Sequence, residues 1–114
     1  MLIVDDEPAL VETLEGLLED DFDVLTASGG ADALKRLAAT APVDVIITDQ
    51  RMPGMLGVDL LVEVARLYPD TVRMVVTAYA DLQPIVDAIN RGSVYRFLSK
   101  PYDIEELREA IEEG

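Results

Sequence analysis

The sequence predicts an α/β fold, a doubly wound sandwich in which helices cover both faces of one parallel sheet. Short apolar runs alternate with stretches of helical periodicity along the 114 residues, and the alternation repeats five times. Several of the short runs are rich in Val and Ile, as strands buried on both faces of a parallel sheet are. Right-handed crossovers between such strands give the doubly wound arrangement. A single domain, residues 1–114, is expected at this length.

Five segments have the composition of strands. The third and fourth are nearly continuous in apolar residues, which is typical of strands at the centre of a parallel sheet. The expected strands are residues 2–5, 23–26, 43–48, 72–77 and 94–99.

Each expected strand is followed by apolar residues at helical spacing, which form a stripe along one face of a helix. Pro8 falls in a first helical turn, Ser28 is a candidate cap of the second helix, and Gly92 follows the fourth stripe as a helix-ending glycine does. The stripes are Leu10, Leu14, Leu17 and Leu18; Leu34, Leu37 and Ala38; Val58, Leu61, Val62 and Ala65; Leu82, Ile85, Val86 and Ile89; and Ile104, Leu107 and Ile111.

The composition argues against several classes of function. There are 23 acidic and 9 basic residues, for a net charge of −14, whereas binding to nucleic acid needs clustered Lys and Arg. With no His and no Cys, the chain cannot build a zinc site from those ligands or a Ser–His or Cys–His nucleophile pair. No apolar run approaches the ~18 residues of a membrane helix, and the absence of Cys fits a cytoplasmic location. Carboxylate chemistry remains, and carboxylates suit hard cations such as Mg²⁺.

Polar side chains follow the expected strands where ligands bind in open α/β sheets, beyond the carboxyl ends. Asp5 and Asp6 end the first strand, Asp49 follows the third, Thr77 ends the fourth and Lys100 follows the fifth. If the first and third strands are neighbours, three carboxylates converge, and a divalent cation would relieve their repulsion. A single Asp after a strand is more often a turn former or helix cap, so this prediction depends on the combination.

Four stretches of the chain resemble the receiver domain of two-component response regulators. In order along essentially the whole chain they are LIVDDE (residues 2–7), DQRMPGMLG (49–57), VTA (76–78) and FLSKP (97–101). The D-x-x-M-P-x-x-x-G run, taken with the acidic pair and the Lys-Pro pair, is highly specific. The resemblance implies a flavodoxin-like sandwich of five parallel strands in the order 2-1-3-4-5. It also implies a domain of a longer protein with an output domain, which fits a last helix that stops at acidic residues.

The resemblance assigns the phosphoacceptor and the metal site. Asp49 would take a phosphoryl group from phosphohistidine on a sensor histidine kinase, so the His that this chain lacks would lie on its partner. Asp6 would bind Mg²⁺ directly and Asp5 through water, and Asp49 and the backbone carbonyl of Arg51 would complete the protein ligands.

The resemblance also assigns phosphate-binding residues. The hydroxyl of Thr77 and the backbone N–H of Ala78 would donate hydrogen bonds to the phosphoryl group, and Lys100 would pair with it as a point charge. Pro101 matches the position of the family's cis-proline. Thr77 and Phe97 match the switch residues, although a Phe on a buried strand is equally compatible with a core role.

The family's usual output surface is the face of the fourth helix, the fifth strand and the fifth helix. Phosphorylation would bias a two-state equilibrium of that face, where a homodimer could also form. Residues 91–96 lack the acidic pair found there in many winged-helix regulators. Residues 49–51 and 94–101 are more similar to receivers of hydrogenase-type transcription activators or of cyclic-nucleotide phosphodiesterases. Leu10 and Gly16 lie on the first helix, which docks the kinase in the family.

Three alternatives to a phosphorylation-controlled switch would each need a different set of residues. A phosphorylation-independent pseudo-receiver would lack pocket residues, whereas every residue type is present here. A phosphohydrolase with an Asp nucleophile would need Asp-x-Asp after the first strand, so we expect no enzyme beyond self-directed phosphoryl transfer and autodephosphorylation. A flavin module would need a phosphate loop where this chain has Asp5, Asp6 and Glu7, whose charges would repel phosphate.

Overall fold

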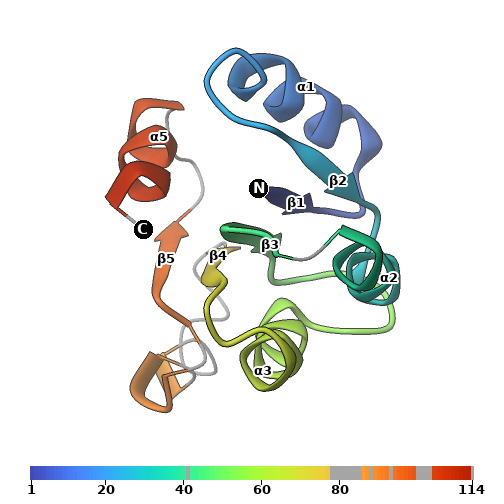
Figure 1. Cartoon of the computed structure of the whole chain (residues 1–114), viewed down its shortest axis with the longest axis vertical. Helices are drawn as coiled ribbons and strands as arrows, with labels where there is room; N and C mark the ends of the chain where they lie inside the picture. Colours follow the sequence, from blue (N-terminus) through green and yellow to red (C-terminus); the bar gives the residue numbers. More distant parts are fainter. Residues whose placement is uncertain (41, 78–85, 88, 93, 100–103, 114) are drawn as a thin grey trace.

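Figure 1 shows the computed structural model of the chain, which describes residues 1–40, 42–77, 86–87, 89–92, 94–99 and 104–113. Residues 86–87 and 89–90 are helical, within the expected fourth helix, and its Leu82 and Ile85 lie outside the described residues. The other elements are β1 (Leu2–Val4), α1 (Pro8–Leu18), β2 (Leu25–Ala27), α2 (Gly30–Thr40), β3 (Val45–Asp49), α3 (Gly57–Leu67), β4 (Val72–Thr77), β5 (Arg96–Ser99) and α5 (Ile104–Glu113).

The strands form one parallel sheet in the order β2-β1-β3-β4-β5, as predicted. The chain first places β2 on one side of β1 and then β3 on the other, so the strand order reverses at β1. The register pairs Val4 of β1 with both Ala27 of β2 and Thr48 of β3. The carboxyl ends of β1 and β3 therefore lie side by side at the point where open α/β sheets bind ligands.

β2 and β3 each begin two residues later and end one residue later than expected, since we placed them at residues 23–26 and 43–48. β2 covers only Leu25–Ala27 because its ladder is as long as its partner β1, which has three residues. Asp23 instead lies beside the start of the chain, where its backbone carbonyl accepts a 2.6 Å hydrogen bond from the amino group of Met1.

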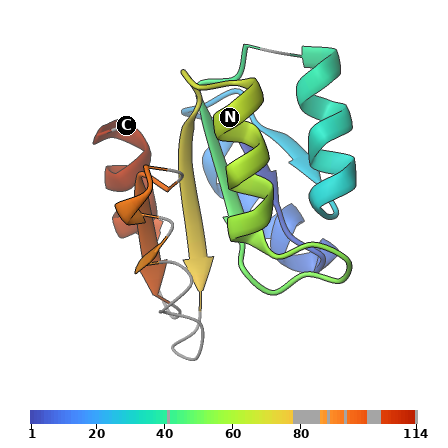
Figure 2. The same cartoon turned by 90° about the horizontal axis from the view of Figure 1, so that it is seen from below.

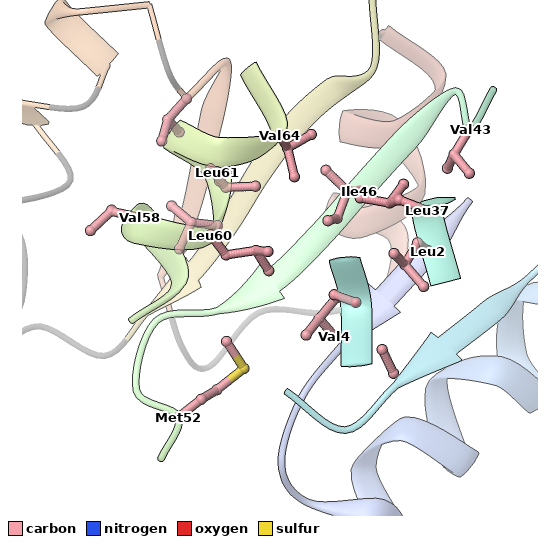
Figure 3. Close-up of a cluster of buried hydrophobic side chains, with 14 residues drawn as sticks. Leu2, Val4, Leu37, Val43, Ile46, Met52, Val58, Leu60, Leu61 and Val64 are labelled. Atoms are coloured by element: carbon pink, nitrogen blue, oxygen red, sulfur yellow. The ribbon is translucent and has the colours of Figure 1, made fainter. Parts of the chain in front are cut away.

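Helices cover both faces of the sheet, with α1 and α5 on one side and α2 and α3 on the other (Figures 1 and 2). Each side has its own cluster of buried side chains, and fully burying one Leu or Val contributes about 1.5–3 kcal/mol to stability. The helical members are Leu14 and Leu18 of α1 with Leu107, Ala110 and Ile111 of α5, and Ala33 and Leu37 of α2 with Val58, Leu60, Leu61 and Val64 of α3. Figure 3 shows the second cluster, in which Ile46 of β3 lies beside Leu37.

The buried faces of α1, α2 and α3 include residues that the predicted stripes did not contain. Leu17, Ala38, Val62 and Val86, which we placed on apolar stripes, are exposed. In α1 the buried stripe is Val11, Leu14 and Leu18, because Leu17 is one residue, or about 100° of helix rotation, away from Leu18.

The expected helix signals were partly confirmed. α1 begins at Pro8, and Gly92 has a φ of +80° while its N–H donates to the carbonyl of Ile89. Ser28 is not the cap that we predicted for α2, which begins at Gly30. Instead the carboxylate of Asp32, in the first turn, accepts the N–H of Ser28 at 3.1 Å. Among the described residues, no helix combines the length and apolar character needed to cross a membrane.

Candidate functional site

Three carboxylates meet at the carboxyl edge of the sheet. Asp5 and Asp6 directly follow β1 and Asp49 is the last residue of the neighbouring β3, so the register of the sheet brings them together. One carboxylate oxygen from each residue lies within 4.8 Å of the others. Asp5 is buried, Asp49 is half-buried and Asp6 is exposed. Oxygen donors at this spacing can hold a divalent cation, and within the described part of the chain no other group of acids, His or Cys does so.

Asp5 also shapes the turn that leads into α1. Its Oδ1 accepts the N–H of Glu7 at 3.0 Å, and its own N–H donates to the carbonyl of Ala27 at 3.2 Å. The turn-forming role common for an Asp after a strand therefore applies to Asp5, and it fixes the carboxylate that lies deepest in the cluster. The N-terminus of α1 follows at once, and its partial positive charge lies on the same side as the three acids.

Gln50, which the sequence analysis missed, is a buried side chain next to Asp49. It is 1% exposed, and its Oε1 accepts the N–H of Val58 at 2.9 Å. Its backbone N–H donates to the carbonyl of Val76 at 3.0 Å, and its carbonyl accepts the N–H of Gly57 at 2.9 Å. No pattern in the sequence indicates this role, but the structure gives its physical cause. The N-cap of α3 is Leu56, which offers no side-chain hydrogen bond, so its first turn needs an acceptor from elsewhere.

Steric crowding explains why the D-x-x-M-P-x-x-x-G run ends in a glycine, Gly57. A Cβ on Gly57 would lie 2.4 Å from the backbone oxygen of Asp49, far closer than two such atoms can approach. The start of α3 therefore packs directly against the backbone of the residue that carries the candidate nucleophile, and only glycine leaves room for it.

The loop between Asp49 and Gly57 is packed on both sides. Met52 is buried and extends toward the cluster of β1, β3, α2 and α3, as Figure 3 shows. Met55 lies so close to Gly30 that a Cβ there would be 2.5 Å from its sulfur atom. Arg51, the predicted source of a metal-binding carbonyl, is exposed in this loop. Met52 and Met55 therefore anchor the loop to the fold, while its other residues after Gln50 are exposed.

The other predicted phosphate-site residues are only partly within the described chain. Thr77 is buried at the carboxyl end of β4, and its neighbour Val76 pairs with Asp49, so Thr77 lies at the same edge as the acids. Ala78, Lys100 and Pro101 lie outside the described residues.

Phe97 is half-buried on β5, where it pairs with Val75 and packs against the α2–α3 cluster. This contact fits the core role that we weighed beside the switch role, and the switch role stays a prediction. Tyr95 lies just before β5 and is 52% exposed.

The two predicted kinase-docking residues have different environments on α1. Leu10 is half-buried and packs against the α1–α5 cluster. Gly16 is exposed, and a Cβ built on it would meet no atom within 4 Å. Packing inside the described fold therefore gives no reason for a glycine at position 16.

Comparison with known proteins identifies close relatives. The family model described as the response regulator receiver domain matches residues 1–112. The hydrogenase transcriptional regulatory protein HoxA of Cupriavidus necator is 39% identical over 98% of this chain and 24% of its own length. The chain thus spans about a quarter of the length of the curated relatives that it matches.

Solved structures agree with this relationship. The crystal structure described as adenylate cyclase from Rhodopirellula baltica has a TM-score of 0.96 and 37% identity, covering 98% of this chain and 83% of that one. A response regulator receiver domain protein from Clostridium thermocellum has a TM-score of 0.93 and 32% identity, covering 98% of this chain and 90% of that one. The HoxA match fits the similarity to hydrogenase-type activators seen in the sequence.

Proposed function

Because this chain belongs to the response regulator receiver domain family, we propose that it accepts a phosphoryl group on Asp49 and works as a signalling switch. Phosphoacceptor switching is the general function of this family, and its members partner with sensor histidine kinases in two-component systems.

One observation carries the proposal. The carboxylate oxygens of Asp5, Asp6 and Asp49 gather within 4.8 Å at the point where the strand order reverses. Three negative charges at this spacing repel one another, and a cation between them would relieve this repulsion. The donors are all hard oxygens, which suits Mg²⁺, the cation that receiver domains typically bind. In this proposal Asp6 and Asp49 bind it directly, Asp5 binds it through water, and the carbonyl of Arg51 adds a ligand.

The half-buried Asp49 is the nucleophile in this proposal. One of its carboxylate oxygens forms a bond to phosphorus while the N–P bond of the kinase phosphohistidine breaks, and the electron pair of that bond leaves with the imidazole ring. Bound Mg²⁺ would neutralise charge on the carboxylate and phosphoryl oxygens. Thr77 donates its hydroxyl to the phosphoryl group. The N–H of Ala78 and the ammonium of Lys100 are assigned the same task from the family motif.

The output is proposed to lie on the face of the fourth helix, β5 and α5, with Thr77 and Phe97 as the switch pair. An effector attached to residues 1–114 in a longer protein would read this face, and a homodimer could form through it. Because HoxA and NtrC are named as transcriptional regulators, we propose a transcriptional effector in the cytoplasm. The kinase would dock on α1 near Leu10 and Gly16. We propose no nucleic-acid or membrane contact for this domain.

Labelling with a small phosphodonor such as phosphoramidate, with Mg²⁺ present, tests the proposal. Intact-protein mass spectrometry should show one added phosphoryl group. The shift should vanish in Asp49→Asn and persist in Asp44→Asn, a matched control whose acid lies at the opposite edge of the sheet.

Two other results would each favour a rejected alternative. If the donor labels a known receiver but not this chain, the chain is a phosphorylation-independent module. Sustained release of phosphate from an aryl phosphate, lost in Asp49→Asn, would indicate a phosphohydrolase.

A further inference from the structure

We propose that Gln50 is a positioning residue that couples the Asp5–Asp6–Asp49 cluster to the first turn of α3. The inference rests on the proposed function of the cluster and deepens it, because it names the side chain that sets where Asp49 stands. Gln50 itself would touch neither the cation nor the phosphoryl group.

Gln50 is hydrogen-bonded to three different parts of the fold. Its backbone N–H donates to the carbonyl of Val76 in β4. Its carbonyl accepts the N–H of Gly57 at the end of the loop, and its Oε1 accepts the N–H of Val58 in α3. The three bonds are 2.9–3.0 Å long, which is ideal for N–H···O bonds. Asp49 directly precedes Gln50 and is joined to it by a planar peptide, so a shift of the Asp49 backbone would strain these hydrogen bonds.

Of the three hydrogen bonds, only the one from Val58 to Oε1 depends on the side chain at position 50. Any residue other than proline at position 50 could make the two backbone hydrogen bonds, but the hydrogen bond from the Val58 N–H needs a side-chain acceptor of this length. Val58 is buried, and the Leu56 N-cap supplies no side-chain acceptor for the first turn of α3. Without the amide oxygen of Gln50, the buried N–H of Val58 would have no acceptor. The first turn of α3 would then shift until this N–H meets water, because a buried donor without an acceptor is costly.

The position of the loop matters because the three carboxylates repel one another. Repulsion favours a separation of Asp49 from Asp5 and Asp6, whereas cation binding needs them close. The bond from α3 holds the loop in the compact arrangement before the cation arrives, which lowers the cost of rearrangement on binding. The coupling is reciprocal, so a cation in the cluster should in turn stabilise the first turn of α3.

The test uses Gln50→Met, which keeps a similar length but offers no oxygen acceptor. Its matched control is Thr71→Val, which removes another buried hydrogen bond, from Thr71 Oγ1 to the Val43 carbonyl at 2.7 Å. Thr71 lies before β4, at the opposite edge of the sheet. Mg²⁺ affinity is measured by calorimetry, and amide hydrogen exchange is followed by NMR with and without Mg²⁺.

In Gln50→Met the dissociation constant for Mg²⁺ should rise about tenfold, the change that the net contribution of one hydrogen bond gives. In Thr71→Val it should stay within twofold of the wild-type value. In the wild type, Mg²⁺ should slow exchange of the Val58 amide more than that of the Val72 amide, which bonds to Asp44 at the opposite edge.

Equal Mg²⁺ affinities in the two variants would overturn the inference. So would an unchanged Val58 exchange rate in the wild type on adding Mg²⁺, and that measurement stands even if Gln50→Met does not fold. Phosphodonor labelling of the wild type distinguishes failure of the proposed function from failure of the Gln50 coupling. If Gln50→Met weakens Mg²⁺ binding but the wild type takes no phosphoryl group, the proposed function is refuted and the coupling still holds.

Discussion

Acidic side chains gather at both edges of the sheet, but only one edge brings their oxygens together. At the carboxyl edge, Asp5, Asp6 and Asp49 lie within 4.8 Å of one another. The opposite edge has a hollow of about 520 Å³, and one carboxylate there is paired, with 2.9 Å between Asp21 and Arg108. The acids that line this hollow are Asp21, Asp23, Asp44 and Asp70.

The difference between the edges is one of crowding rather than of charge. At the carboxyl edge two adjacent strands end side by side, and Gly57 and Gln50 hold the following loop against the backbone of Asp49. At the opposite edge the acids line a hollow, and among the described residues no three of their carboxylate groups meet within 4.8 Å. A set of carboxylates becomes a candidate site when strand register and a packed loop force the charges together.

Of the changes predicted from this comparison, Gly57→Ala should have the largest effect on stability, because the carboxyl edge is crowded. The new Cβ would overlap the carbonyl oxygen of Asp49, which belongs to the backbone of a buried strand and has little room to move. We expect a loss of about 3 kcal/mol in the free energy of unfolding, the upper range for an overpacked core site. Urea denaturation followed by circular dichroism measures it. A loss below 0.5 kcal/mol would mean that the carboxyl edge is no more crowded than the other.

The next largest effect is the stabilisation by Mg²⁺, which should depend on an acid at the carboxyl edge and not on one at the opposite edge. At a concentration one hundred times its dissociation constant, Mg²⁺ should stabilise the wild type by about 2.7 kcal/mol. Asp6→Asn should lose most of this gain and Asp44→Asn should keep it, as measured by the shift in melting temperature. An equal response of the two variants would contradict the distinction.

The smallest expected effect has the opposite sign and comes from the open part of α1. Gly16→Ala places a methyl group where no atom lies within 4 Å, and alanine favours the helix over glycine. We expect a gain of about 0.5–1 kcal/mol in stability, measured by the same denaturation. If Gly16 contacts the kinase, phosphoryl transfer from the cognate kinase should slow while labelling by a small phosphodonor stays unchanged. Equal rates in both reactions would remove Gly16 from the docking surface.

Periodicity predicted the alternation of strands and helices, because it depends on patterns within single elements. The strand order came from the resemblance of motifs, and with that order the acids that follow the first and third strands were expected to meet at one edge. The role of Gln50 could not be predicted this way, because its side chain bonds to Val58, beyond a loop whose path the sequence does not specify. The start of β2 was wrong for a related reason, since the length of its ladder is set by β1, far away in the chain.

The separation of Asp5 from Asp49 in the sequence has a consequence for folding. The two residues become neighbours only when β1 pairs with β3, a non-local pairing of the kind that forms slowly in folding chains. A nascent or misfolded chain offers Asp49 without its companions, and a lone carboxylate in water is a poor acceptor for a phosphoryl group. In the proposed mechanism, then, only a correctly assembled molecule can receive the signal.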